Sequence, residues 1–267
     1  MKRTVSDAFD ESSVAQGEHN KRARNHSPRQ VLQSHRNIPM VISLTGTSSS
    51  TLENVDIFVG PNNVHFNINR EMLCDRVPYF DNMFNPRHRR SLKNHATFPN
   101  LEPEMFRVFL RWVQTGRVEP AGGVERFFNS DRPNHLYALA DKLCAPDLMD
   151  TIISMKLGTM RAGDKMDSWN DMKWIYKNLP RGSPMRKLVA YEIGYIIHTE
   201  RDPLALKLFE IDDLVMMMVS HPSILEGYLT LCRNRPQGKP FPDPSQLRKC
   251  LFHHHVFGRR CSVRTRF

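Results

Sequence analysis

The residues of this sequence that could do chemistry gather near its C-terminal end, where a cysteine precedes a run of histidines. Cys250 is followed three residues later by His253-His254-His255, and Cys261 comes shortly after them. Zinc in proteins is usually held by about four Cys or His ligands in a tetrahedron. Adjacent histidines cannot all face one metal, and no Cys-x-x-Cys pair accompanies them. We therefore interpret the run as an exposed tail with clustered histidines and predict neither a metal nor another cofactor.

Signatures of catalysis are absent from the sequence. It has no Gly-x-Ser-x-Gly elbow, no phosphate-binding loop, no dinucleotide-binding glycine pattern and no His-Glu-x-x-His pair. Its five cysteines are odd in number and scattered in spacing, which favours a reducing compartment over a disulfide framework. Cys74 and Cys144 lie within apolar patterns, so we predict that both are small core residues. We expect a protein that is not an enzyme.

Positive charge is concentrated at the two ends of the chain, whose formal net charge is +10. Residues 1–40 hold seven Lys or Arg against four Asp or Glu, and residues 233–267 hold nine against one. The middle of the chain is therefore close to neutral, whereas a nucleic-acid-binding domain usually carries its charge on a folded face. A basic tail can still hold anionic partners loosely. Nucleic-acid binding through residues 233–267 thus stays open as an alternative.

Residues 1–53 are rich in Ser, Asn, Arg and Gln and show no periodicity, which predicts a disordered segment. Within it, Lys21, Arg22 and Arg24 could bind the acidic grooves of a nuclear-import receptor, or could belong to a solvated basic tail. No run of about 18 apolar residues indicates a membrane span, and no apolar region of a secretory signal follows the N-terminus. We expect the nucleus or the cytoplasm and no membrane association.

Hydrophobic periodicity predicts an α+β domain over residues 54–160. Asp56 to Gly60 and Val64 to Ile68 form a hairpin, because the turn residues Gly-Pro-Asn-Asn separate them. A third strand is predicted at His95–Phe98. Helices are predicted at Arg70 to Cys74, from Pro78 to Phe84, from Glu102 to the terminating Gly116, around Leu136 to Leu143, and from Pro146 to Gly158.

The pattern from 161 to 232 is helical throughout, which predicts a helical extension. Helices are expected at Trp169 to Leu179, after Ser183-Pro184, after Asp202-Pro203, at Ile211 to Val219 and at Ile224 to Cys232. From Arg235 onward prolines and glycines are frequent and periodicity is lost, so residues 233–267 are predicted to be a basic, largely irregular tail.

Two clusters in this extension have alternative interpretations. Met216-Met217-Met218 could form an adaptable binding surface, but helical spacing favours core packing. An aromatic cluster consists of Trp169, Trp174 and Tyr176. It could anchor a peptide, but the large apolar surface of the three rings favours burial against the preceding domain.

The order of these elements, with their local motifs, resembles the BTB/POZ domain. That family has an Asp-led strand ending in glycine, a Phe-x-Val-His-Arg-x-x-Leu segment, Tyr-Phe-x-x-Met-Phe, a helix ending Trp-x-Tyr-Thr-Gly, and a Leu-Tyr-x-Leu-Ala-Asp-Lys-Leu helix. The matching segments here are Asp56 to Gly60, Phe66 to Leu73, Tyr79 to Phe84, Phe106 to Gly116 and Leu136 to Leu143. Asn69 replaces the usual histidine and Gln114 the usual tyrosine. The downstream helices resemble the extension of many fungal BTB proteins.

The resemblance implies a small sheet capped by helices, followed by an all-helical extension, and a protein that acts through surfaces. Members of the family bind partners or a second copy, so the resemblance implies an adaptor or scaffold. It assigns partner contacts to Asp56, Asn69, Met83 and Phe84 and to the loop Arg87-His88-Arg89-Arg90.

A substrate adaptor of a cullin-type ubiquitin ligase is the narrower alternative that the resemblance offers. In members that bind a cullin, the loop after the Met-Phe helix tends to be acidic. Here that loop is basic, opposite in sign to the loop of those members, so it would face a surface that suits an acidic loop with like charge, which penalises docking. Cullin binding therefore stays an alternative that the loop charge disfavours.

Overall fold

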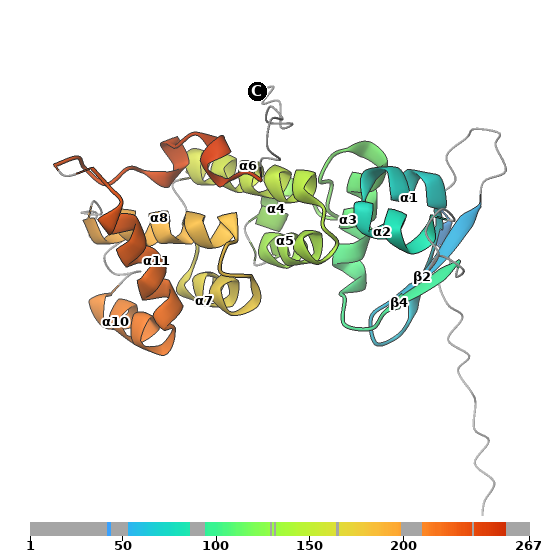
Figure 1. The fold of residues 1–267 in the computed structure, drawn as a ribbon, viewed down its shortest axis with the longest axis horizontal. Coiled ribbons are helices and arrows are strands. Elements are labelled where there is room, and N and C mark those ends of the chain that lie inside the picture. Colours follow the sequence, from blue (N-terminus) through green and yellow to red (C-terminus); the bar gives the residue numbers. More distant parts are fainter. Residues whose placement is uncertain are drawn as a thin grey trace, which may run out of the picture. The chain divides into compact units, whose positions relative to one another are not determined.

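The computed structural model describes residues 42–43, 53–85, 94–128, 130, 132–163, 166–198, 210–236 and 238–254. These residues all belong to a single compact unit that spans residues 39–267. Figure 1 shows a small sheet followed along the chain by helices. No helix in the described part is long and apolar enough to cross a bilayer.

The sheet contains four strands in the order β1-β3-β2-β4. They are β1 (Ile42–Ser43), β2 (Asn54–Val59), β3 (Val64–Asn69) and β4 (His95–Phe98). β2 and β3 form the predicted antiparallel hairpin, while β4 runs parallel to β2 and β1 parallel to β3. Because β1 lies within the segment that we predicted to be disordered, the prediction is wrong for these two residues. The rest of residues 1–52 lies outside the described part.

One face of the sheet forms the floor of the core. Val55, Ile57 and Val59 are fully buried and alternate with residues of the other face, as a half-buried strand requires. Three helices cover this face: α1 (Arg70–Arg76), α2 (Pro78–Phe84) and α3 (Pro103–Thr115). Rings of the sheet and helices meet edge to face, since the centroids of Phe66 and Phe106 lie 5.0 Å apart.

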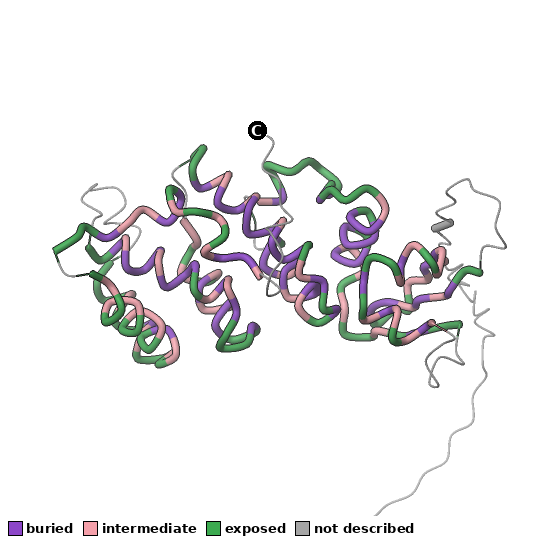
Figure 2. The backbone as a smooth tube through the Cα atoms, turned by 45° about the horizontal axis from the view of Figure 1, so that its top comes forward, coloured by how far each residue is buried: buried purple, intermediate pink, exposed green. Residues whose placement is uncertain are grey.

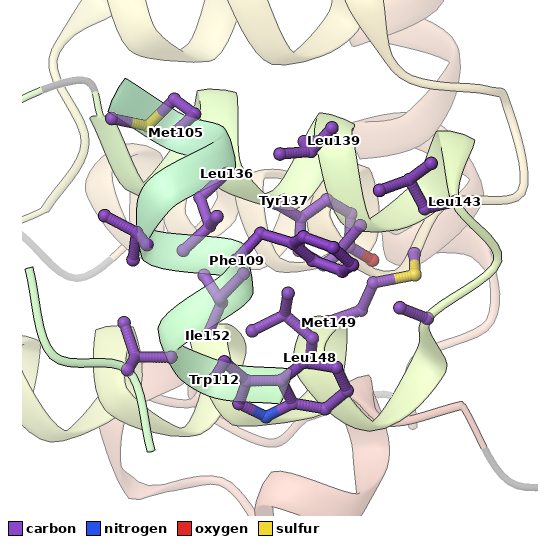
Figure 3. Packing of buried hydrophobic residues seen from close by; sticks show 14 of the residues in the cluster. Met105, Phe109, Trp112, Leu136, Tyr137, Leu139, Leu143, Leu148, Met149 and Ile152 are labelled. Atoms are coloured by element: carbon purple, nitrogen blue, oxygen red, sulfur yellow. The ribbon is translucent and has the colours of Figure 1, made fainter. Parts of the chain in front are cut away.

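Helix α3 has the predicted boundaries, with proline in its first turn and Gly116 as its left-handed C-cap (φ 73°). Its buried side chains face the next two long helices, α5 (Arg132–Lys142) and α6 (Pro146–Gly163). Figure 3 shows Phe109 and Trp112 of α3 packed with Tyr137, Leu148 and Ile152 from these helices. The short helix α4 (Val124–Phe128) was not predicted.

Two predictions in this region are wrong. α6 does not end at Gly158 but continues to Gly163, because Leu157 and Met160 remain on its buried face and support the helix. Cys144 is exposed and has a φ of 50°, since it lies in the turn after α5 rather than in the core. Cys74 is half-buried, and burial raises the pKa of its thiol to about 11.

The extension consists of α7 (Trp169–Asn178), α8 (Pro184–His198), α10 (Ile211–Ser220) and α11 (Pro222–Arg233). The predicted packing against the preceding domain is confirmed for Trp174, whose ring stacks on His135 of α5 with centroids 4.4 Å apart. Tyr176 is buried, but it contacts Arg186 within the extension. The methionine prediction is wrong for Met216, which is 63% exposed, and confirmed for Met217. Asp202-Pro203 lies outside the described residues.

Residues 238–254, which we call the C-terminal strap, return from α11 to α6 and α8. The strap contains the short 3-10 helices η1 (Pro244–Gln246) and η2 (Lys249–Phe252). Phe241 and Phe252 are buried, and the centroid of Phe252 lies 5.5 Å from that of Tyr191 on α8. This part of the predicted tail is thus irregular but packed. Buried positions, purple in Figure 2, accordingly continue from the sheet domain into the extension.

The strap is pinned to α6 through its histidines. The Ser154 hydroxyl lies 2.8 Å from His253 Nε2, and the backbone N–H of His254 donates to Asp150 Oδ1 at 2.7 Å. The interpretation of these histidines as exposed is therefore wrong for His253, because Ser154 and the core enclose it. Among the described residues no group of three or more His, Cys, Asp or Glu could hold a metal. His255 and Cys261 lie outside them.

The strap depends on the absence of a side chain at Gly194. A Cβ there would stand 1.9 Å from Phe241 Cζ, so Gly194→Ala must expel the buried ring. We expect this variant to lose about 2 kcal/mol of unfolding free energy in urea titrations. Gly158→Ala is the matched control, because it is helical with open space around it and should gain about 0.5–1 kcal/mol. Equal effects of the two variants would contradict the role of the strap.

Candidate protein-interaction surface

The outer face of the sheet carries a connected row of polar side chains centred on Asp56. The Asn67 amide donates to Asp56 Oδ1 at 2.9 Å, and His65 Nε2 lies 2.7 Å from the same oxygen. Asn54 donates to Asn67 Oδ1 at 2.6 Å and extends the row. All four side chains point away from the core because strand residues alternate between faces. We call Asn54, Asp56, Phe58, His65 and Asn67 the outer sheet face.

This hydrogen bonding favours the charged form of Asp56. The bonds from Asn67 and then from His65 lower the pKa of the Asp56 carboxyl below its ordinary value. Beside it, the ring of Phe58 stacks on His65 with centroids 4.9 Å apart. The face thus offers an ionised acceptor and a half-buried aromatic ring, both held in place by neighbours.

A second polar cluster lies buried where α5 and α6 meet the extension. Lys156 Nζ on α6 is 2.6 Å from Asp167 Oδ1 and donates to Asn134 Oδ1 at 3.0 Å. The backbone N–H of Asp167 donates in turn to Glu192 Oε2 on α8 at 3.2 Å. One cation thus links helix α5, helix α6 and the start of the extension. We call Asn134, Lys156, Asp167 and Glu192 the junction cluster.

The junction cluster contains one positive charge, that of Lys156, and two carboxyl groups. A single lysine cannot neutralise the negative charge of both carboxyls. Burial raises the pKa of Glu192 well above its ordinary value, and Asp167 raises it further. Burial also opposes the charge of Lys156, but Asp167 and Glu192 outweigh it and hold the lysine pKa above its ordinary value. Glu192 has no exposed surface. Burial also raises the pKa of Asp167, but the bond to Lys156 opposes that rise, so of the two carboxyls Glu192 is the one whose surroundings more strongly favour the protonated form.

Comparison with protein families identifies the domain that contains the sheet. Residues 47–157 match the family model of the BTB/POZ domain. This part of the chain is a BTB/POZ domain. A comparison with curated proteins found no match. The match agrees with the α+β fold of a small sheet capped by helices, and BTB domains are protein–protein interaction modules.

The structure places four of the residues that the resemblance assigned to partner contacts in four different environments. Asp56 lies on the outer sheet face of the BTB domain. Asn69 caps α1, because its side-chain oxygen accepts the N–H of Met72 at 2.8 Å. Met83 is half-buried at the end of α2. Phe84 is only 1% exposed and stacks on Phe80, so its assignment to a surface is wrong because the ring fills the core.

The remaining assigned residues lie outside the described part of the chain. They are the loop Arg87, His88, Arg89 and Arg90 and the candidate import signal Lys21, Arg22 and Arg24. Their roles stay predictions.

Sequence reasoning missed the partners of Asp56 and the whole junction cluster. The alternating pattern of β3 predicted that His65 and Asn67 face away from the core. It did not predict their pairing with Asp56, which follows from the register of the hairpin, where Asp56 lies opposite Asn67. Glu192 had a weaker signal, as the single acid in the apolar run that continues through Ile193 and Ile196. Nothing in the sequence joined it to Lys156.

Asn69 can be tested as a helix cap. Asn69→Ala should lower the free energy of unfolding by about 1 kcal/mol, because the N–H of Met72 loses its acceptor. Asn69→Asp keeps an acceptor and should stay near the parent stability. Urea titrations of the three proteins make the comparison, and an alanine variant as stable as the aspartate variant would exclude the capping role.

The raised pKa of Glu192 predicts a particular pH dependence of stability. Above the ordinary carboxyl value of 4.5 the unfolded chain releases a proton that folded Glu192 retains, so this residue makes stability fall as pH rises. Glu192→Gln keeps the acceptor oxygen but cannot ionise, so the variant does not lose stability at this position as pH rises. We expect the variant to be more stable than the parent by about 1 kcal/mol at neutral pH and equally stable near pH 4.

Thermal or urea unfolding across this pH range provides the measurement. A stability difference that does not change with pH would show that Glu192 is not protonated in the folded chain.

Proposed function

We propose that this chain is a non-enzymatic adaptor or scaffold that acts through its BTB domain, either by self-association or by recruiting a partner protein. The outer sheet face is the observation that supports the proposal. Helices α1, α2 and α3 cover the other face of the sheet, so the row around Asp56 remains available. Its side chains are already ordered by mutual hydrogen bonds, which lowers the entropic cost of binding.

The chemistry of this face suits a protein partner. The half-buried ring of Phe58 offers an apolar contact, and ionised Asp56 offers an acceptor for a cationic or amide donor. Interfaces commonly combine an aromatic anchor with surrounding polar groups. By contrast, the buried ionisable groups of the junction cluster bind one another and hold the extension in place.

The cullin-adaptor alternative depends on the end of α2. Met83 is half-buried there and can contribute to a contact, whereas Phe84 belongs to the core. Met83→Asp is therefore the informative variant for this alternative, because Phe84→Asp would disrupt folding whatever the chain binds. Co-purification of a cullin with the parent chain, and its loss with Met83→Asp, would support the alternative.

Self-association and recruitment can be tested with one set of variants. We expect light scattering of the full chain at tens of micromolar to show a dimer, and Phe58→Glu on the outer sheet face to dissociate it. Val124→Glu is the control, because Val124 is an exposed apolar residue on α4. If the parent chain is strictly monomeric, self-association is excluded. Recruitment is also excluded if cross-linked partners from lysate are the same for Phe58→Glu and the parent chain.

A further inference from the structure

Helix α10 is apolar on two opposite faces, although only one of them packs against the rest of the described structure. Leu214, Met217 and Met218 form the inner face, with Met217 only 3% exposed and the other two packed against the core. Positions four or three residues apart share a face of a helix. Val215, Met216 and Val219 accordingly lie together on the opposite face.

These three side chains are unusually exposed for their type. Val215 is 51% exposed, Met216 63% and Val219 70%. A helix that is apolar all round is normally buried all round, and grouped exposed apolar residues commonly mark an interaction site. Asp212 precedes this group by one turn on the same side of the helix. We call Asp212, Val215, Met216 and Val219 the outer face of α10.

Helix α10 is acidic, whereas the chain as a whole is basic. Glu210, Asp212 and Asp213 stand at its start and α10 has no Lys or Arg, while the whole chain has a formal net charge of +10. The three acids at the start of α10 are exposed. Acids there also suit the helix dipole, but the dipole does not account for the apolar residues that follow them.

We propose that the outer face of α10 binds an amphipathic helix of another protein that carries Lys or Arg beside its apolar stripe. The three apolar residues form a ridge one helix wide, which fits the apolar stripe of a second helix. The acids at one end would then pair with basic residues of the partner and set the direction in which it binds.

Charge argues against a second copy of α10 as the occupant. Parallel pairing would set Asp212 and Asp213 against their own counterparts. Antiparallel pairing would set them near Ser220 and His221, where no Lys or Arg lies. Like charges across an interface oppose association, and unpaired acids gain nothing from it.

The proposal does not depend on the BTB domain acting as an adaptor, because the outer face of α10 and the outer sheet face share no residues. It adds a second surface of different chemistry: acidic and aliphatic here, hydrogen-bonding and aromatic on the sheet. The experiment below therefore includes the sheet variant Phe58→Glu as an independent control.

The probe is a fluorescein-labelled peptide of Leu and Lys, about four helical turns long, with leucines at helical spacing. Two control peptides carry the same residues in scrambled order, or Glu in place of Lys. Fluorescence anisotropy with the full chain should show the Leu/Lys peptide binding about ten-fold more tightly than either control. Added salt should weaken its binding.

Variants of the chain locate the site. Val215→Ser with Val219→Ser should weaken binding of the Leu/Lys peptide about ten-fold, and Asp212→Asn with Asp213→Asn should weaken it and flatten its salt dependence. Val124→Ser and Phe58→Glu should bind like the parent chain. Because the altered side chains on α10 and Val124 are exposed, circular dichroism of these variants should show parent-like folding, and the same measurement checks the fold of Phe58→Glu.

Three outcomes would overturn the proposal. They are equal binding of the Leu/Glu peptide, binding that neither double variant changes, and a dimer of the parent chain that Val215→Ser with Val219→Ser dissociates. The last outcome would identify a second copy as the occupant. Parent-like binding by Phe58→Glu keeps this result separate from the fate of the adaptor proposal.

Discussion

The linkage of helix α6 to helix α8 is the constraint on which the rest of this structure depends. α6 completes the BTB domain by packing on α5, and it continues past residue 157, where the family match ends. Two features then bind α8 to it: the junction cluster around Lys156 and the C-terminal strap. The strap packs on both helices, so a segment far along the chain closes the core that α6 begins.

The two features contribute differently. Strap packing removes large aromatic side chains from water, which stabilises the fold in proportion to the buried area. The junction cluster offers less net stability, because the cost of desolvating charges offsets most of their attraction. Its contribution is geometric, since Lys156 meets both of its partners only when Asn134 of α5 and Asp167 stand in one arrangement. The backbone N–H of Asp167 then donates to Glu192 and fixes α8 to the same cluster. Apolar packing alone would tolerate small shifts between these helices.

The described part of the chain presents two surfaces of contrasting chemistry. The outer sheet face is built from hydrogen-bonded side chains on neighbouring strands, so its geometry is set by the strand register. The outer face of α10 is built from aliphatic side chains on one helix, with acids at one end. A chain with two such surfaces fits the role of a scaffold, because different partners can be distinguished by chemistry rather than by competition for one site.

The local elements and the family could be predicted from the order of the residues. Alternation identified the hairpin, helical spacing identified the long helices, and proline and glycine marked their ends, because these signals depend on neighbours within a few residues. These local signals do not predict features that depend on contacts with distant parts of the chain. Leu157 and Met160 carry α6 beyond Gly158, the turn after α5 exposes Cys144, and core packing buries Phe84.

Three links became visible from the folded chain alone: Asp56 with His65, Lys156 through Asp167 with Glu192, and Gly194 with Phe241. The residues that contact Lys156 and Gly194 lie far from them in the sequence, and the residue that contacts Asp56 is set by the register of the hairpin. Local hydrophobic periodicity therefore does not reveal these contacts. Burial then gives these residues properties that their types alone do not imply. The pKa of Glu192 is raised well above its ordinary value, and an aromatic ring occupies the space that a side chain at Gly194 would need.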